Sequence, residues 1–253
     1  MKMLCTTITV LILCSAMSMY GSDNILIIAH RGASGDLPEN TLQSFQGAMD
    51  CGALMIELDV HLCATGHLVV IHDQTVDRTT DGQGEVAQMT LAELKCLDAG
   101  NGQTIPTLDE VFELVDRRMR INVELKGVGT GAPVADLIEH YVNDRGWLHT
   151  DFRISSLDFE QLQDFRICNK RVDMGLTLVD IPESCNKLLA DINHLQVSGV
   201  DAWIEGTTCV FIQLMHEQGL TVYLYTINGP KQFETVSNCG ADGIYTNYPE
   251  KFL

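Results

Sequence analysis

Four short apolar runs in this chain end in side chains that can ionise. Residues 25–31 end in Ala-His-Arg, residues 54–59 in Glu-Leu-Asp, residues 68–73 in His-Asp, and residues 121–126 in Glu-Leu-Lys. Short runs rich in Ile and Val predict buried strands. Because parallel strands in a barrel or open sheet place their carboxyl ends on one face, these endings predict one shared site.

The carboxylates among these endings predict a metal site. Glu57 and Asp59 are two residues apart on a strand, so both face the same side. Glu124 ends another strand and could supply a third oxygen. Carboxylate oxygens without cysteine or histidine ligands favour one hard divalent cation, Mg²⁺ or Ca²⁺. The alternative is that these carboxylates form salt bridges with Arg31 and Lys126.

The two histidines at strand ends are candidates for acid–base chemistry. Imidazole titrates near neutral pH, so His30 and His72 could move protons. Arg31 offers a planar fork to an anion, and Lys126 offers a point charge. A metal together with these two cations would suit a phosphoryl group.

The order of the predicted elements favours a (β/α)8 TIM barrel. A turn at Ala64-Thr65-Gly66 sends residues 67–71 back as a strand, which predicts a β-hairpin after the second strand. The barrel domain is expected to cover residues 23–253, and a doubly wound open sheet is the rival. The expected strands are 25–30, 54–59, 67–71, 121–125, 152–156, 172–178, 199–203, 221–226 and 242–245. The expected helices are 41–51, 91–97, 108–118, 132–144, 158–168, 183–192, 208–218 and 230–238.

Composition narrows the class of partner. The chain has 253 residues, 45% of them apolar, and a formal net charge of −18. Nucleic-acid binding and docking on anionic membranes both need clustered cations, so neither is expected. A small-molecule partner is expected instead, with no stable membrane insertion of the mature domain. The sequence makes no prediction of oligomeric state.

The N-terminus predicts export. Residues 1–20 contain an apolar stretch followed by small residues, which resembles a signal peptide or an N-terminal anchor. Cleavage would make the protein periplasmic or secreted; without it the protein would be membrane-associated or cytoplasmic. Cys14 allows a lipid-attachment alternative. Seven cysteines remain after a cut near residue 18, without zinc-ligand spacing, and most are expected to be buried apolar residues.

Longer motifs resemble a known family. The stretches A-H-R-G-A-S-G-D-L-P-E-N-T, I-E-L-D-V, V-V-I-H-D, V-D-R-T-T-D-G, I-P-T-L-D-E-V and N-V-E-L-K resemble the glycerophosphodiester phosphodiesterases over residues 25–252. The resemblance implies a TIM barrel with His30 and His72 as general acid and base. It also implies that Glu57, Asp59 and Glu124 bind Ca²⁺ or Mg²⁺. Phosphate-binding roles fall on Arg31 and Lys126, and Glu39 is placed near the substrate.

Some positions depart from the family pattern. Tyr225 stands where a tryptophan often lines the substrate, Leu157 replaces a phenylalanine, and Asn247 replaces an aspartate. The first two concern specificity and not chemistry. The expected activity is hydrolysis of glycerophosphodiesters to sn-glycerol 3-phosphate and an alcohol. The alternatives are a lysophospholipase D-type activity on lysophospholipids and a catalytically silent phosphodiester-binding barrel.

Overall fold

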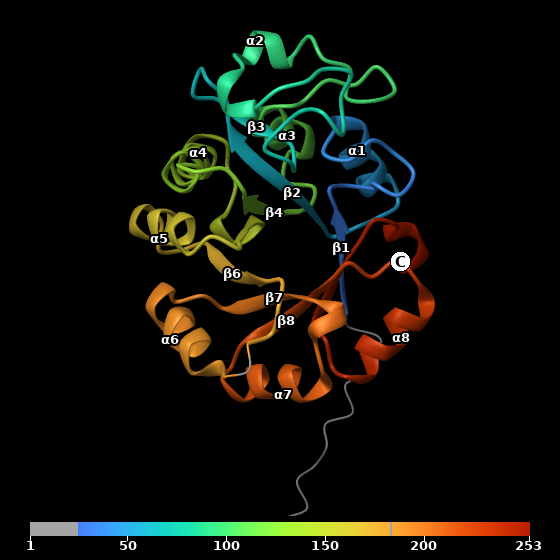
Figure 1. Cartoon of the computed structure of the whole chain (residues 1–253), viewed down its shortest axis with the longest axis vertical. Helices are drawn as coiled ribbons and strands as arrows, with labels where there is room; N and C mark the ends of the chain where they lie inside the picture. The colour runs from blue at the N-terminus through green and yellow to red at the C-terminus, as the bar shows by residue number, and fades with distance from the viewer. Residues whose placement is uncertain (1–24, 183) are drawn as a thin grey trace, which may run out of the picture.

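A computed structural model of the chain describes residues 25–182 and 184–253. The predicted signal peptide or anchor at residues 1–20 lies outside the described residues. Eight parallel strands form the barrel (Figure 1). They are β1 (Leu26–His30), β2 (Met55–Leu62), β4 (Arg120–Leu125), β5 (Phe152–Ser156), β6 (Asp173–Leu178), β7 (Gly199–Trp203), β8 (Thr221–Tyr225) and β9 (Gly243–Thr246).

The barrel closes through β1. This strand pairs in parallel with β2, aligning His30 with Glu57, and on its other edge with β9, aligning Ala29 with Thr246. An open doubly wound sheet would leave two edges unpaired, so the predicted TIM barrel is confirmed and the rival is excluded. Closure brings the carboxyl ends of all eight strands to one face, which is where ionisable strand endings converge.

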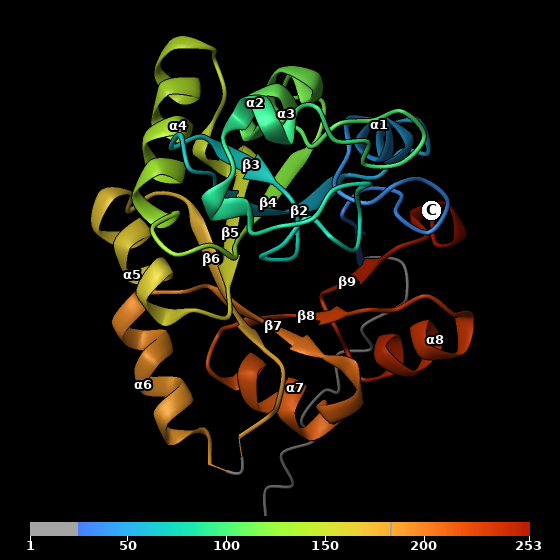
Figure 2. The same cartoon turned by 45° about the horizontal axis from the view of Figure 1, so that its top comes forward.

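Helices surround the strands, as the views in Figures 1 and 2 show. They are α1 (Leu42–Asp50), α2 (Leu91–Leu94), α3 (Leu108–Val115), α4 (Gly131–Asp144), α5 (Phe159–Cys168), α6 (Cys185–Leu195), α7 (Cys209–Glu217) and α8 (Pro230–Asn238). Short 3-10 turns are η2 (Val86–Gln88), η3 (His149–Asp151), η4 (Ile204–Gly206) and η5 (Pro249–Lys251). Thr90 caps α2, and Glu93 completes a capping box.

Two of these helices end earlier than the sequence predicts. Helix α3 stops at Val115 because Asp116 and Arg117 both adopt the left-handed conformation, with φ of 41° and 61°. Helix α2 stops at Leu94, since the amide of Leu97 bonds to the carbonyl of Leu94 in a tighter turn.

The predicted hairpin is present. Strand β3 (Leu68–Val70) runs antiparallel to β2, with Val60 opposite Val70. The segment between β3 and α3 has its own small apolar core, which includes Ile71, Val86 and Leu94. Figure 1 shows this segment at the top of the view, beside α1 and α3. The segment is therefore anchored as a packed unit beside the strands that carry the histidines.

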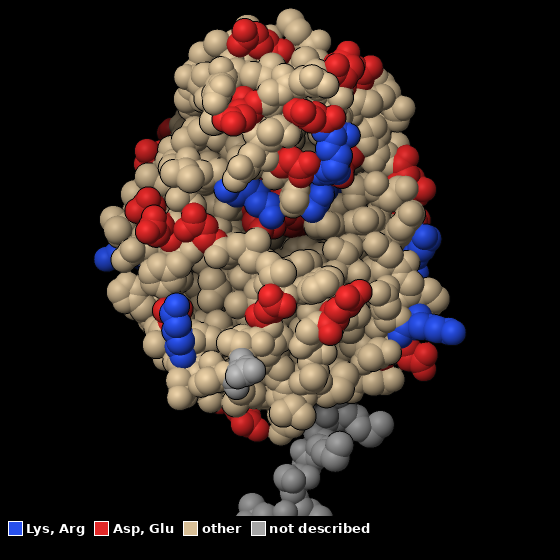
Figure 3. Space-filling model, viewed as in Figure 1, with Lys and Arg blue, Asp and Glu red and all other residues tan. Residues whose placement is uncertain are grey.

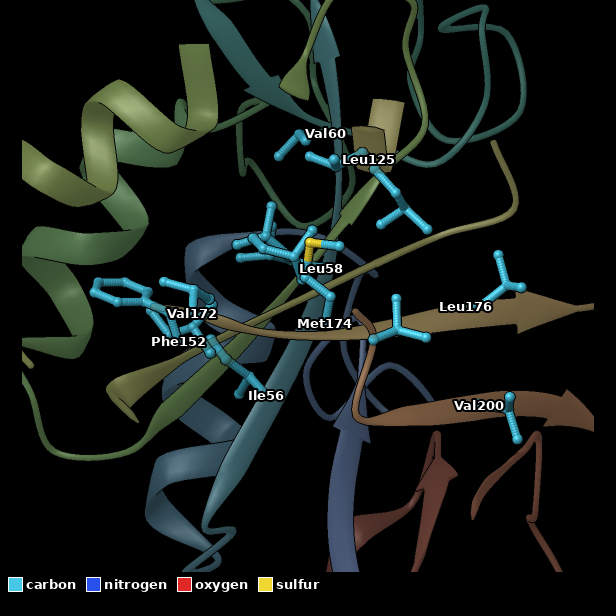
Figure 4. Packing of buried hydrophobic residues seen from close by; sticks show 14 of the residues in the cluster. Ile56, Leu58, Val60, Leu125, Phe152, Val172, Met174, Leu176 and Val200 are labelled. Carbon is cyan, nitrogen blue, oxygen red and sulfur yellow. The ribbon is translucent and has the colours of Figure 1, made fainter. Parts of the chain in front are cut away.

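The main apolar core lies between the strands and the helices. Figure 4 shows Leu58, Leu125 and Phe152 from neighbouring strands within it, all almost fully buried. Because strand side chains alternate, the next residues along each strand point into the barrel. That interior is polar in part: Arg153 donates two hydrogen bonds to Asp201, at 2.7 and 2.8 Å, and both residues are buried.

A glycine leaves room for this ion pair. A Cβ on Gly175 of β6 would lie 1.9 Å from Nη2 of Arg153. Only glycine allows the guanidinium to cross the barrel at this level. The buried pair of Arg153 and Asp201 therefore forms a fixed polar floor beneath the strand ends.

The expectation that most cysteines are buried apolar residues is wrong. Cys209 and Cys239 form a disulfide that joins the start of α7 to the end of α8. Of the remaining described cysteines, Cys63 is buried, whereas Cys96 and Cys168 are exposed. The described residues include no helix that is both long and apolar enough to cross a membrane.

Candidate active site

The carboxyl ends of the barrel strands enclose a pocket of about 330 Å³. Figure 3 shows a hollow at the centre of one face, with Lys and Arg side chains along its upper margin and acidic side chains within it. Seven of the predicted site residues line the pocket: His30, Arg31, Glu57, His72, Glu124, Lys126 and Tyr225. The sequence-based expectation of one shared site is thus met by the fold.

Glu57, Asp59 and Glu124 form a compact carboxylate cluster. One oxygen from each lies within 4.8 Å of the others. Strand pairing produces this closeness, because Asp59 of β2 is aligned with Glu124 of β4. Asn40 donates a hydrogen bond of 2.8 Å to Oδ2 of Asp59, and the backbone amide of Arg31 donates one of 2.9 Å to Oε2 of Glu57. These bonds fix the direction of both carboxylates.

Burial and mutual repulsion make the cluster electrostatically strained. Burial, reinforced by the charges of Asp59 and Glu124, raises the pKa of Glu57 well above its ordinary value. Burial and the charge of Asp59 raise the pKa of Glu124 to about 7. Burial opposes ionisation of Asp59 too, but Arg31 and Lys126 lower its pKa. With all three carboxylates ionised, the cluster would therefore carry more negative charge than Arg31 and Lys126 balance.

A divalent cation fits this cluster. Oε1 of Glu57 and Oδ1 of Asp59 are buried without a hydrogen-bond donor among the described residues. A buried oxygen without a partner is costly, and a hard cation would satisfy both oxygens. The donors are carboxylate oxygens, which is the set that Mg²⁺ and Ca²⁺ prefer.

His30 lies at the end of β1, beside the cluster. Its Nδ1 is 2.7 Å from Oδ1 of Asn247, and its Nε2 is 3.9 Å from Oε2 of Glu57. Asn247 can only accept through Oδ1, so the ring carries its proton on Nδ1 and presents Nε2. Burial, aided by the charge of Arg31, lowers the pKa of His30 to about 4. The neutral imidazole is therefore the form present near pH 7.

His72 follows the hairpin strand and faces the same pocket. Its Nδ1 lies 2.6 Å from Oδ1 of Asp73, which fixes the ring and leaves Nε2 for the pocket. The carbonyl of His72 lies 3.1 Å from Nε2 of His61, which supports the loop from below. The two candidate acid–base residues thus reach the pocket from separate strands and have separate supporting partners.

Arg31 and Lys126 flank the carboxylates. Arg31 has a left-handed backbone with φ of 57°, which turns its amide toward Glu57. Its Nε lies 3.3 Å from Oδ2 of Asp59. Nζ of Lys126 lies 3.0 Å from Glu124 and 3.7 Å from Asp59. Both cations therefore pair with the cluster while they also line the pocket.

The predicted substrate-binding residues Glu39 and Tyr225 lie in different places relative to the pocket. Glu39 is not among the pocket-lining residues, and its carboxylate is bound by Arg31 and Arg78. Tyr225 lines the pocket, and its hydroxyl donates a 2.9 Å hydrogen bond to the carbonyl of Leu178. The ring of Tyr225 is consequently held in place as part of the wall.

Several residues that line the pocket were not predicted from the sequence. Asn122, Ser155 and Asp201 point inward from β4, β5 and β7. Their only signal was a polar residue at an inward position of an apolar strand. Trp203 at the end of β7 and Val179 after β6 also line the pocket. They carry no sequence signal, because single exposed apolar residues are common.

Comparison with known proteins agrees with this geometry. Residues 30–251 match the model of the glycerophosphoryl diester phosphodiesterase family. A glycerophosphodiester phosphodiesterase of Caldanaerobacter subterraneus is 35% identical over 242 residues, covering 90% of this chain and 96% of the relative. One from Bacillus altitudinis is 33% identical over 244 residues, covering 89% of this chain and 95% of the relative.

Solved structures give the same result. An Oleispira antarctica phosphodiesterase in complex with its product sn-glycerol-3-phosphate superposes with a TM-score of 0.81 and 30% identity, covering 90% of this chain and 95% of that chain. A glycerophosphodiester phosphodiesterase from Agrobacterium tumefaciens superposes with a TM-score of 0.77 and 29% identity, covering 90% and 98% of the two chains.

Proposed function

Because the chain belongs to the glycerophosphoryl diester phosphodiesterase family, we propose that it hydrolyses glycerophosphodiesters to sn-glycerol 3-phosphate and an alcohol. We further propose that the reaction needs one divalent cation, Mg²⁺ or Ca²⁺. The product complex of the Oleispira relative supports the first proposal. The buried carboxylate cluster supports the second.

One observation carries the proposal. Three carboxylate oxygens lie within 4.8 Å of one another, and two of these carboxylates line a pocket together with two histidines and two cationic side chains. A binding module would have no need for two imidazoles that each present one nitrogen. A purely structural ion-pair network would not line an open pocket.

The chain's own residues divide the work by position. A divalent cation held by the cluster would supply positive charge to the phosphate. Arg31 and Lys126 bind phosphate oxygens and stabilise the charge that develops in the transition state. One imidazole accepts the proton of the attacking oxygen at Nε2, and the other donates a proton to the leaving alkoxide. Asn247 and Asp73 hold the two rings in position.

The experiment is a turnover assay with and without chelator. The purified chain is incubated with glycerophosphocholine or glycerophosphoethanolamine, and release of sn-glycerol 3-phosphate is measured. We expect turnover that EDTA abolishes and that Mg²⁺ or Ca²⁺ restores. Full turnover after exhaustive chelation would contradict the metal proposal. Binding of diesters without any turnover would identify a silent barrel instead.

A second candidate activity is favoured by the apolar rim, which we define as Leu157, Val179 and Trp203. These residues follow or end β5, β6 and β7, line the pocket, and are 47%, 48% and 37% exposed. An acyl chain on the substrate could cover them. A lysophospholipase D-type activity would appear as release of lysophosphatidic acid from lysophosphatidylcholine in the same assay.

We also propose that the mature domain is exported. Disulfides persist in oxidising compartments, and Cys209 and Cys239 are bonded. Expression of the full chain in a bacterial host, fractionation and mass measurement test this proposal. A processed, oxidised protein outside the cytoplasm is expected, whereas an unprocessed cytoplasmic protein would contradict it.

A further inference from the structure

An arginine outside the pocket lining holds two carboxylates at once. Nε and Nη2 of Arg78 donate to Oδ2 and Oδ1 of Asp73, at 2.7 and 3.0 Å. Nη1 and Nη2 donate to Oε2 and Oε1 of Glu39, both at 2.8 Å. All three guanidinium nitrogens are therefore used in two bidentate pairs, a geometry that lysine cannot form. We call Arg78, Asp73 and Glu39 the Arg78 clamp.

Each carboxylate of the clamp also holds a residue of the candidate active site. Oδ1 of Asp73 accepts from Nδ1 of His72 at 2.6 Å. Oε1 of Glu39 accepts from Nη1 of Arg31 at 2.9 Å. A continuous chain of charged hydrogen bonds thus runs from His72 through the clamp to Arg31. It joins the loop after β3 to the loop after β1.

The exposure of its side chains limits what the clamp adds to fold stability. The side chain of Arg78 is 47% exposed, and Glu39 and Asp73 are 21% and 29% exposed. Isolated ion pairs at such exposure typically add about 0–1 kcal/mol to the free energy of unfolding, and a bidentate network such as this one adds more than an isolated pair. Without Arg78, however, two neighbouring carboxylates would repel each other, and each would carry its partner away from the pocket. We therefore expect the loss of Arg78 to change the positions of His72 and Arg31 in the site.

We propose that Arg78 is a positioning residue for the phosphodiesterase reaction, which fixes His72 through Asp73 and Arg31 through Glu39. The inference rests on the proposed function. It gives Glu39 a role in orienting Arg31 and not in touching substrate. It also assigns a task to the arginine of the V-D-R-T-T motif, which the two-histidine chemistry leaves unused.

The test compares Arg78→Gln and Arg78→Lys with the wild type on glycerophosphocholine at saturating metal. Loss of a partner that orients a functional group costs about 10–100-fold, so we expect kcat/KM to fall by that factor in both variants. Through His72 the fall should appear in kcat alone, and through Arg31 it should appear in KM as well as kcat. The melting temperature should change by no more than a few degrees. Arg145→Gln is the matched control, since Arg145 is 53% exposed and pairs with Glu113 away from the pocket.

Chemical rescue gives a readout that a merely structural arginine would not show. Because Arg78 is half exposed, millimolar guanidinium should enter the gap in Arg78→Ala and restore a measurable part of kcat, whereas ethylammonium should not. Asp73→Asn combined with Arg78→Gln should lose less than the product of the single losses, since both act on His72.

The outcomes separate the two proposals. An inactive wild type would overturn the proposed function. An active wild type with unchanged kcat/KM in Arg78→Gln would overturn the clamp alone. Full activity in Arg78→Lys, or losses that simply multiply in the double variant, would also contradict the bidentate positioning role.

Discussion

The two sides of the barrel mouth are built from opposite kinds of side chain. On the side of β1 to β4, Glu57 and Asp59 are buried, and His72 is tied to Asp73 by a charged hydrogen bond. On the side of β5 to β7, the apolar rim is about half exposed and its side chains are not tied by such bonds in the described structure. Phosphoryl chemistry needs a fixed constellation, whereas the alcohol of a diester can vary. From this difference we expect the reaction to take place on the first side and the choice of substrate to depend on the second.

We call the side of β1 to β4 the fixed side. The largest expected effect comes from removing its two imidazoles. His30→Ala and His72→Ala should each lower kcat by about 10²–10⁴-fold, because each removes one proton-transfer group. KM should change far less, since neither ring is the main phosphate ligand. Steady-state kinetics on glycerophosphocholine measure both constants. His140→Ala is the control, because His140 is exposed, pairs with Asp144 and does not line the pocket. A near-normal kcat in either variant would make that histidine structural.

The next largest effect is expected from changing Arg31, the proposed phosphate ligand. Arg31→Lys keeps the charge but loses the planar fork, so kcat/KM should fall by about 10–100-fold, the worth of one charged hydrogen bond. Its contacts with Asp59 and Glu39 offer a different outcome. If Arg31 serves only those pairs, the melting temperature would drop and kcat/KM would stay unchanged. Measuring both quantities on one variant decides between binding and scaffolding.

The fixed side was the part that the sequence predicted best. A histidine or carboxylate after an apolar run marks a strand end, and barrel topology brings strand ends together, so no long-range information was needed. The hydrogen-bond partners that hold the site residues in place were not predicted. Asn247 contacts His30 from 217 residues away, and the pairing of Arg153 with Asp201 depends on how β5, β6 and β7 close. Such contacts follow from register and not from local pattern.

The side of β5 to β7, which we call the open side, and the state of the cysteines were harder to predict. Val179 and Trp203 are ordinary apolar residues in the sequence, and only their place at strand ends gives them meaning. Cys209 and Cys239 meet because α7 and α8 are neighbours in the ring of helices. Helix ends were also displaced where the backbone turned left-handed, as at Asp116.

A smaller effect links the metal to pH through the fixed side. The folded-state pKa of Glu124 is raised to about 7 from an ordinary 4.5. This group therefore stabilises the metal-free fold below about pH 4.5, and that contribution is lost as the pH rises through 7. A cation competes with these protons. The rise in melting temperature on adding Ca²⁺ or Mg²⁺ should thus be larger at pH 8 than at pH 5.

The size of this shift can be estimated. Metal at 100 times its Kd adds about 2.7 kcal/mol, which corresponds to roughly 5–10 °C for a chain of this length. Thermal unfolding with and without metal at the two pH values measures it. Glu57→Gln should reduce the shift at pH 8, because one ligand charge is lost. An equal shift at both pH values would show that protons do not compete with the metal for these carboxylates.

The smallest effect tests the open side. Leu157→Ser should lower kcat/KM for lysophosphatidylcholine about fivefold relative to glycerophosphocholine, because losing contact with one or two acyl methylenes costs about 1 kcal/mol. Leu54→Ser makes the same chemical change just before the amino end of β2, at the end of the barrel away from the pocket. Leu54 is 66% exposed and lies outside the pocket lining. It should leave the ratio unchanged. A ratio that moves only in Leu157→Ser would show that the apolar rim selects substrates. If neither variant changes it, the rim is ordinary exposed surface, and the contrast between the two sides would describe chemistry alone.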